Sequence, residues 1–334
     1  MKAIMDSFET HSSNIAGIQP HPFWVMVRKE IAGHIRSWRF IVLLLLIVLT
    51  FWGATSVAMS NIREVVSKAS DADDLFLYLK ILTTTEGTLP PFHVFLNFLG
   101  PLLGISLGFD AINSEQQNGT LTRIMAQPVY RDNLLLSKFV SSLILVGALL
   151  ITLVLLMIGG GIIITGVLIE AEEVLRILSF TIICMVYVGF WLWLSILLSI
   201  CFKQASTSAL TAIGIWLFFT VFYQIIINLV AKAFAPGANE LSPIEILHYN
   251  GLILNLLRLA PSQLYTDATT TLLMPSVRSL GPVTMEQMAG AIPSPLPFKE
   301  SLMIVWPQVS GLIAATVMCF ALSYYLFMRR EIRS

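Results

Sequence analysis

Six long runs of uncharged, mostly apolar residues divide the chain. They are Phe40–Met59, Phe92–Phe109, Phe139–Ile169, Ile177–Phe202, Gln204–Ala231 and Ser301–Met328. A transmembrane helix needs about 20 predominantly apolar residues, and each run is long enough. The pattern predicts an all-α polytopic membrane protein with six transmembrane helices. Composition agrees, because 56% of the residues are hydrophobic and only 12% are charged, about half the charged share of a soluble domain.

The polar segments between the runs predict the orientation. If both termini are inside, the inner segments carry the excess of Lys and Arg, and the outer segments carry the excess of Asp and Glu. Cytoplasmic segments of membrane proteins are enriched in basic residues. The expected topology is therefore N-in and C-in, with a multi-pass location in the plasma membrane.

The remaining segments divide into a cytoplasmic N-terminus (1–39), two outer loops (61–91 and 232–300) and a short tail (332–334). Within the first, His21–Arg39 places apolar residues at helical spacing on one side and basic residues on the other. This pattern predicts an amphipathic helix lying at the membrane interface. Ile244–Leu259 in the second outer loop also has helical spacing. In the third run, Gly159-Gly160-Gly161 is expected to mark a bend or the helix exit.

Residues 110–138 form a short hairpin of mixed charge between the second and third runs. It is too short to be a domain, yet it is large enough to receive a partner on the cytoplasmic side. We therefore interpret it as a docking surface, so that the function depends on a protein that binds there.

Several kinds of chemistry are disfavoured by the sequence. The chain contains no GxxxxGK[ST], HExxH or GxSxG pattern, and its five histidines are scattered. It therefore offers no Walker A phosphate loop and no expected catalytic or metal site. The net charge of zero argues against a strongly basic nucleic-acid-binding protein.

The six runs also contain no Asp, Glu, Lys or Arg. Carriers driven by protons or sodium usually hold ionisable groups at mid-membrane, because those groups couple ion flux to transport. Energy is therefore expected to come from elsewhere, most simply from a separate ATPase subunit.

The hairpin resembles the signature of type-2 ABC transporter permeases. The matching residues are, in order, Phe109-Asp110, Ser114-Glu115, Gly119-Thr120-Leu121, Gln127-Pro128-Val129, Arg131 and Leu136-Ser137-Lys138-Phe139. Arg28-Lys29-Glu30 is similar to the opening basic–acidic element of that family. Leu256–Gly281 is similar to a loop of the stand-alone permeases that include the permease of nitrous oxide reductase maturation.

The resemblance implies a dimer of six-helix permeases, with residues 40–331 as the permease domain and two separate ABC ATPase subunits. ATP and Mg²⁺ then belong to the ATPase, and this chain binds no cofactor. The hairpin is implied to be the coupling helix, with Gly119 permitting a tight turn and Thr120 capping the next helix. The implied coupling residues are Asp110, Glu115, Gly119, Thr120, Leu121, Arg123, Pro128, Arg131 and Lys138. For Asp110, simple neutralisation by a neighbouring Lys or Arg is an equal alternative.

Polar residues within the spans are candidates for a substrate path. They are Asn97, Tyr223, Gln224 and Asn228. Amides at membrane depth also form interhelical hydrogen bonds, and this second interpretation carries more weight. The substrate stays open between lipid-like molecules, peptides, sodium, and copper or sulfur species.

Two other functions stay open as alternatives to an exporter permease. In the first, the chain is a membrane scaffold whose outer loops recruit an extracytoplasmic protein while the ATPase acts as a mechanical switch. In the second, it is an ion-coupled carrier. Membrane lipid is an expected partner in all three.

Overall fold

The computed structural model describes residues 22–68, 76–83, 89–126, 130–234, 243–275 and 296–329. Helices and turns make up these ranges, and no strand occurs within them. Six helical segments among the described residues are long and apolar enough to cross a membrane. They are α3 (Trp38–Lys68), α5 (Phe92–Gly108), α8 (Arg131–Thr165), α9 (Ala171–Cys201), α10 with α11 (Ala205–Leu217 and Tyr223–Ala233), and α15 (Phe298–Arg329). The predicted all-α architecture with six spans is confirmed.

The end of α8 differs from the prediction. The three glycines were expected to bend or end the helix, but α8 continues to Thr165 and ends at Gly166, whose φ is +70°. Two of the glycines have packing reasons. A Cβ on Gly161 would lie 2.4 Å from Cε1 of Tyr78, and one on Gly160 would lie 3.2 Å from Cε of Met59. Neighbouring side chains therefore fill the space on this side of a continuous helix.

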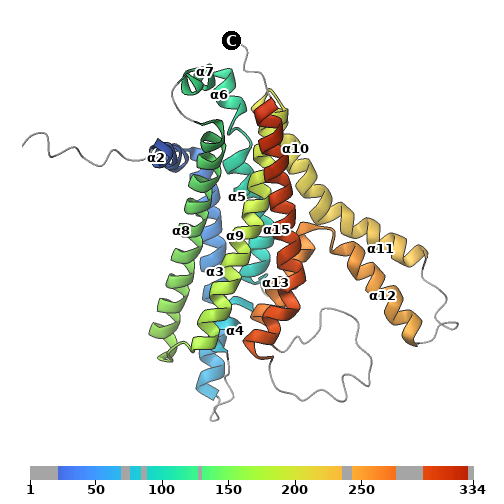
Figure 1. The fold of residues 1–334 in the computed structure, drawn as a ribbon. Helices are drawn as coiled ribbons and strands as arrows, with labels where there is room; N and C mark the ends of the chain where they lie inside the picture. Colours follow the sequence, from blue (N-terminus) through green and yellow to red (C-terminus); the bar gives the residue numbers. More distant parts are fainter. Residues whose placement is uncertain are drawn as a thin grey trace, which may run out of the picture.

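Helix α9 lies at the centre of the bundle (Figure 1). It contacts α5, α8, α10, α15 and the shorter helix α13 (Pro261–Leu273). Its long list of buried side chains includes Phe180, Tyr187, Trp191 and Ile196. Four of the other spans therefore pack directly on α9, and α3 packs outside them on α5 and α8.

The contact between α5 and α9 is close because α5 presents a glycine stripe. Gly100, Gly104 and Gly108 lie at four-residue spacing on the face towards α9. A Cβ on Gly104 would lie 2.7 Å from the Val188 carbonyl oxygen, and one on Gly108 would lie 2.9 Å from that of Leu192. Small residues at this spacing allow membrane helices to touch backbone to backbone.

Arg176 joins several helices at the far end of the bundle, which we define as the end opposite α6 and α7. Its guanidinium is fully buried and donates to the Leu272 carbonyl at 3.1 Å and the Ser301 hydroxyl at 3.2 Å. It also pairs with Glu172 at 2.8 Å. One α9 side chain thus holds α13 and α15, so part of the predicted outer loop 232–300 packs into the bundle.

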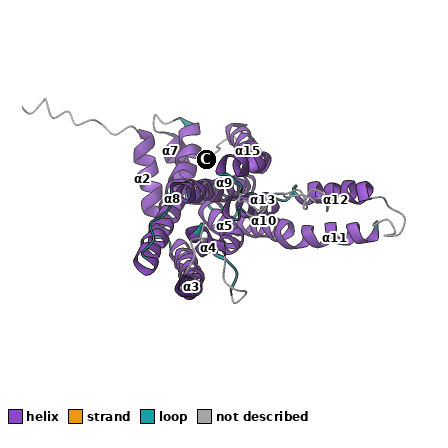
Figure 2. Cartoon of the chain, turned by 90° about the horizontal axis from the view of Figure 1, so that it is seen from below, coloured by secondary structure: helices purple, strands orange, loops and turns teal. Residues whose placement is uncertain are grey.

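The fifth span leaves the bundle. A π-helical segment, Phe218–Phe222, joins α10 to α11. Beyond it, α11 contacts α12 (Pro243–Leu257), and the two helices project together away from the bundle (Figure 2). The Tyr223 hydroxyl donates to the Leu256 carbonyl at 2.7 Å and ties the two helices together. The helix predicted over Ile244–Leu259 is confirmed as α12.

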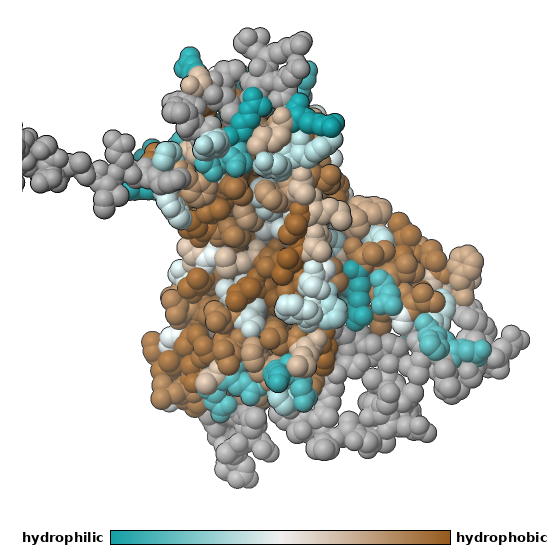
Figure 3. Space-filling model, viewed as in Figure 1, coloured by the Kyte–Doolittle hydropathy of each residue, from teal (hydrophilic) through white to brown (hydrophobic). Residues whose placement is uncertain are grey.

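Helix α2 (Pro22–Ile35) lies across one end of the bundle, at the same end as α6, α7 and the carboxyl end of α15 (Figure 1). It packs against α8, and its Val27 is buried, while Trp24 and Trp38 are exposed. On the visible face, hydrophobic residues predominate across the middle of the bundle, and hydrophilic residues gather near its two ends and on the projecting α11–α12 pair (Figure 3). This distribution fits a bundle that crosses a bilayer, with α2 at the interface. Which end faces the cytoplasm stays a prediction.

The close α5–α9 contact predicts that adding one methyl group at Gly104 destabilises the protein. Gly104→Ala should lower the free energy of unfolding by about 1–3 kcal/mol, because a Cβ there meets backbone that cannot move aside. Thermal unfolding of the purified protein in detergent measures the effect. Gly214→Ala in α10 is the matched control, since a Cβ at Gly214 meets nothing within 4 Å. Equal unfolding temperatures for the two variants would contradict the close contact.

Candidate functional site

The predicted hairpin consists of two short helices at one end of the bundle. They are α6 (Asn113–Gln117) and α7 (Thr120–Met125). Gly119 lies between them with a φ of +67°, a conformation that glycine adopts without the strain of a Cβ. Thr120 is the first residue of α7 rather than its cap, and its hydroxyl donates back to the Glu115 carbonyl at 3.1 Å. The tight turn therefore has the expected glycine, but the threonine ties α7 back to α6.

The start of α6 is bound to the central helix. The Ser199 hydroxyl on α9 accepts hydrogen bonds from the backbone N–H groups of Ile112 at 2.9 Å and Asn113 at 3.2 Å. These are donors that a helix N-terminus leaves without intrahelical partners. Gln117 in turn donates to the carbonyl of Lys203, in the turn after α9, at 2.8 Å. Both ends of α6 are thus bonded to α9 or to the turn that follows it.

An ion-pair cluster binds the hairpin to α2 and α8. It consists of Glu30, Glu115, Lys138 and Lys29. The Lys138 ammonium lies 2.9 Å from Glu115 and 3.2 Å from Glu30, and its side chain is only 6% exposed. Lys29, which is largely exposed, lies 3.7 Å from Glu115. One buried cation therefore joins carboxylates from two separate helices.

A second ion pair links the hairpin to α3. Arg39 lies 2.9 Å from Asp110 and stands 4.8 Å above the ring of Phe109. This is the neutralised arrangement that the sequence left as an alternative for Asp110. The ion-pair cluster and the Arg39–Asp110 pair border one polar cavity of about 260 Å³. His34 and Ser114 also line this cavity.

The pKa values of two α2 groups are both lowered, but for different physical reasons. Burial alone would raise the pKa of Glu30, but the charges of Lys138 and Lys29 outweigh it and hold that pKa below its usual value. Burial also lowers the pKa of His34, whose Nε2 lies 3.3 Å from the Ser142 hydroxyl. Near neutral pH Glu30 in the cluster is therefore ionised, and His34 in the wall of the adjoining cavity is neutral.

The nine predicted coupling residues fall into different environments. Asp110, Glu115 and Lys138 form internal ion pairs, and Leu121 is buried at 3% exposure. Gly119, Thr120, Arg123 and Arg131 are exposed. Pro128 lies outside the described residues. The hairpin thus has an anchored base and a tip, which we define as residues 116–126, where Leu121 is buried but Gln116, Asn118 and Arg123 are exposed.

The four predicted pathway residues are not brought together. Asn97 donates to the Thr266 hydroxyl on α13 at 3.1 Å and accepts from the Tyr187 hydroxyl on α9 at 3.0 Å. It therefore makes the interhelical bonds that the sequence left as an alternative. Tyr223, Gln224 and Asn228 lie on α11, which projects from the bundle.

Two important residues were absent from the predicted site. Ser199 binds the start of α6, and Glu30 completes the ion-pair cluster. A signal for Ser199 exists, because Ser195 and Ser199 repeat at four-residue spacing on the α9 face that meets the α5 glycines. Glu30 was noted only as part of a family element, since its partner lies more than a hundred positions away in sequence. No group of three or more metal-ligating side chains is assembled in the part of the chain that the structure describes.

Six apolar spans with an anchored polar hairpin at one end define a multi-pass membrane protein of the transporter-subunit type. The chain belongs to the ABC-2 family transporter proteins, whose family model matches residues 24–332. It is 25% identical over 256 residues to a probable ABC transporter permease protein NosY of Stutzerimonas stutzeri, covering 74% of this chain and 82% of the relative. A NosY of Pseudomonas aeruginosa is 24% identical over 219 residues, covering 60% and 68%. This chain is therefore a non-catalytic permease of an ABC transporter.

The ion-pair cluster predicts a strong effect of removing its cation. Lys138→Met should destabilise the protein by about 3–5 kcal/mol, because it leaves two carboxylates close together in a largely buried site. Thermal unfolding in detergent measures the loss. The matched control adds Glu30→Gln and Glu115→Gln to the same variant and should recover most of the stability. A single variant as stable as wild type would show that the cluster is not a structural link.

The lowered pKa of His34 predicts that the free energy of unfolding depends on pH. Its pKa is lowered in the folded protein, so below its ordinary value of 6.5 the unfolded chain binds a proton that the folded chain resists. Stability should therefore fall as the pH is lowered from 7.5 to 5.5. His34→Gln should make this decline shallower in unfolding curves, whereas an identical slope in both proteins would exclude His34 as a source. This pH range lies above the pKa of Glu30, which is lowered from 4.5, so Glu30 stays ionised throughout it.

Proposed function

We propose that this chain is the permease subunit of an ATP-driven exporter, and that it works as a homodimer with two separate ATPase subunits. ATP and Mg²⁺ bind to those subunits, and the hairpin receives the movement that ATP binding and hydrolysis produce. Family membership and the two similar permeases support the association with an ABC ATPase. Export is the direction that the resemblance to type-2 permeases favours.

The observation that carries the proposal is the contrast between the tip and the base of the hairpin. The tip exposes polar groups such as Gln116, Asn118 and Thr120 to a partner. The base is bonded to α2, α3, α8 and α9 and continues directly into α5. A displacement imposed on the tip is therefore transmitted to five helices at once. A switch of this kind needs a physical link between the binding surface and the element that moves.

The charge of the exposed surface indicates the kind of partner surface it fits. Arg123 on the tip and Arg131 just after it are exposed. Glu115 and Asp110 have their charges balanced by Lys138 and Arg39 within the chain. Asp132, beside Arg131, is half-buried. The exposed charges offered to a partner, Arg123 and Arg131, are therefore positive, which is complementary to a cleft carrying Asp or Glu.

Reversing these exposed charges tests the proposal. Arg123→Glu with Arg131→Glu should reduce co-purification of the ATPase from native membranes by about tenfold or more, since like charges across an interface cost several kcal/mol. The matched control, Lys232→Glu with Lys299→Glu, makes the same change in charge at exposed sites away from the hairpin. Glu115 is left intact, because changing it would also break the ion-pair cluster.

The result separates the candidate functions. Retention of the ATPase by the hairpin variant would place the docking surface elsewhere on the chain. If no ATPase co-purifies with the wild-type protein, the transporter loses its energy source, and the scaffold or the ion-coupled carrier replaces it. Size-exclusion profiles of all three proteins establish that they are equally folded.

A further inference from the structure

Two hollows between α3 and α8 form one apolar furrow along the helix axes. The hollow nearer α2 has a volume of about 450 Å³ and includes Ile41, Leu44 and Leu149 in its lining. The other has a volume of about 620 Å³ and lies between residues 51–60 of α3 and 155–164 of α8. Leu156 lines both hollows. The furrow therefore follows the spans through much of their length.

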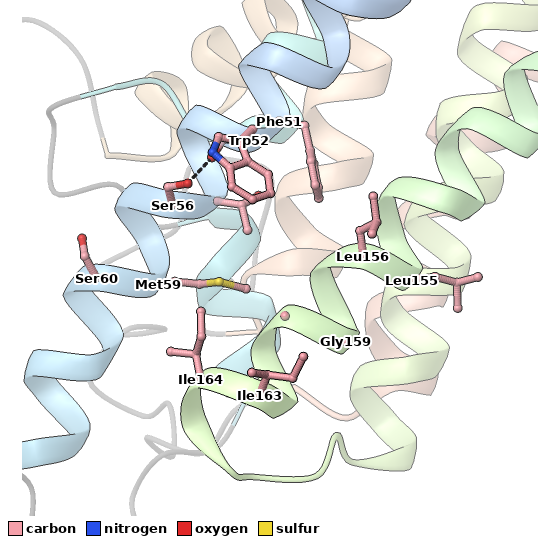
Figure 4. A pocket seen from close by; sticks show the side chains of 12 residues that line it. Phe51, Trp52, Ser56, Met59, Ser60, Leu155, Leu156, Gly159, Ile163 and Ile164 are labelled. Carbon is pink, nitrogen blue, oxygen red and sulfur yellow. Dashed lines mark hydrogen bonds between the residues drawn. The ribbon is translucent and has the colours of Figure 1, made fainter.

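Apolar side chains make up most of the lining of the farther hollow (Figure 4). Phe51, Trp52 and Met59 line it from α3, and Leu156 and Ile163 line it from α8. Trp52 is 71% exposed and Ile163 is 85% exposed, so the hollow opens outwards from the bundle. Both helices are membrane spans, and the surroundings of an open groove on them are lipid chains rather than water.

Of the three consecutive glycines in α8, Gly159 is the one that packing within the chain does not explain. Its two glycine neighbours make room for Met59 and Tyr78, but a Cβ on Gly159 would meet nothing within 4 Å. A glycine inside a helix costs about 1 kcal/mol relative to alanine. Gly159 lines the farther hollow, with the Met59 side chain extending towards it from α3 (Figure 4). A ligand in the hollow would use the space that a side chain here would occupy.

The depth of the hollow matches one half of a bilayer. At a rise of about 1.5 Å per residue, Phe51 lies about 20 Å and Ser60 about 33 Å along α3 from Trp38, where this span begins. The hydrocarbon core is about 30 Å thick. The Ser60 end of the hollow therefore lies where lipid esters meet the acyl chains, and the Phe51 end lies among the chains. Three hydroxyl-bearing residues line the hollow, Thr55, Ser56 and Ser60, and Ser60 lies at the ester end.

We propose that this hollow is a binding site for one acyl chain of a membrane phospholipid from the leaflet farther from the hairpin. The chain lies parallel to α3 and α8, passes over Gly159, and has its glycerol end near Ser60. Shape, depth and the apolar lining all fit an extended hydrocarbon chain. The site is separate from the hairpin and does not depend on ATPase docking.

Photolabelling in vesicles tests the site. The full-length protein is placed in phosphatidylethanolamine and phosphatidylglycerol vesicles containing some phosphatidylcholine with a diazirine in its acyl chain. After illumination, peptide mass spectrometry compares adducts in residues 51–60 and 155–164 with those on the exposed α15 residues Val317, Met318 and Leu322. We expect about tenfold more label on the residues of the hollow than on the α15 residues, which corresponds to about 1.4 kcal/mol of preference.

Two leucine variants identify the hollow as the cause. Gly159→Leu should fill it and reduce the enrichment to the level of α15. Gly53→Leu is the matched control, because Gly53 also has nothing within 4 Å but does not line the hollow. Loss of enrichment in both variants would overturn the assignment to this hollow.

The wild-type ratio is decisive by itself if Gly159→Leu fails to fold. Equal labelling of the furrow and α15 would show ordinary boundary lipid and overturn the proposal. A furrow without label beside a labelled α15 would also overturn it, because it would show that protein, such as a second copy of this chain, covers the furrow.

Discussion

Helices α5 and α9 touch backbone to backbone because Gly104 and Gly108 have no side chains to hold them apart. In a membrane, helix association gains little from the hydrophobic effect, so close packing and interhelical hydrogen bonds must supply it. The Ser195 hydroxyl adds such a bond to the Ile105 carbonyl at 3.2 Å. The spans α8, α10 and α15 pack on α9, and α3 packs on α5 and α8, so the arrangement of the bundle is built on this pair.

Buried cations join neighbouring helices at both ends of the bundle. At one end Lys138 joins α8 to α2 and α6, and at the other Arg176 joins α9 to α13 and α15. A buried charge is costly unless its partners surround it, so each cation holds its neighbours in a defined arrangement. The hairpin thereby becomes an extension of the bundle rather than a free loop. That property is what a coupling element requires, because a flexible loop would absorb the displacement imposed on its tip.

The membrane-facing parts of the chain differ from the tightly packed centre. Helices α11 and α12 project from the bundle, and α3 and α8 enclose an apolar furrow along their length. Both features expose hydrocarbon surface that a bilayer can cover. The proposed acyl-chain site belongs to this outer layer, whereas ATPase docking belongs to the polar end. The two proposals therefore concern different surfaces and different partners.

The sequence alone determined the number and approximate bounds of the spans, because long uncharged runs leave no alternative to membrane helices. It also located the hairpin, since its polar residues interrupt those runs. Tertiary structure decided the rest. Glu115 and Lys138 were predicted as part of a docking surface, yet they form an internal cluster with Glu30, and Asn97 bonds α9 and α13 instead of meeting the α11 residues. Local pattern specifies which helix a residue occupies, but only the packing of distant helices decides whether its polar group meets a partner subunit or another part of its own chain.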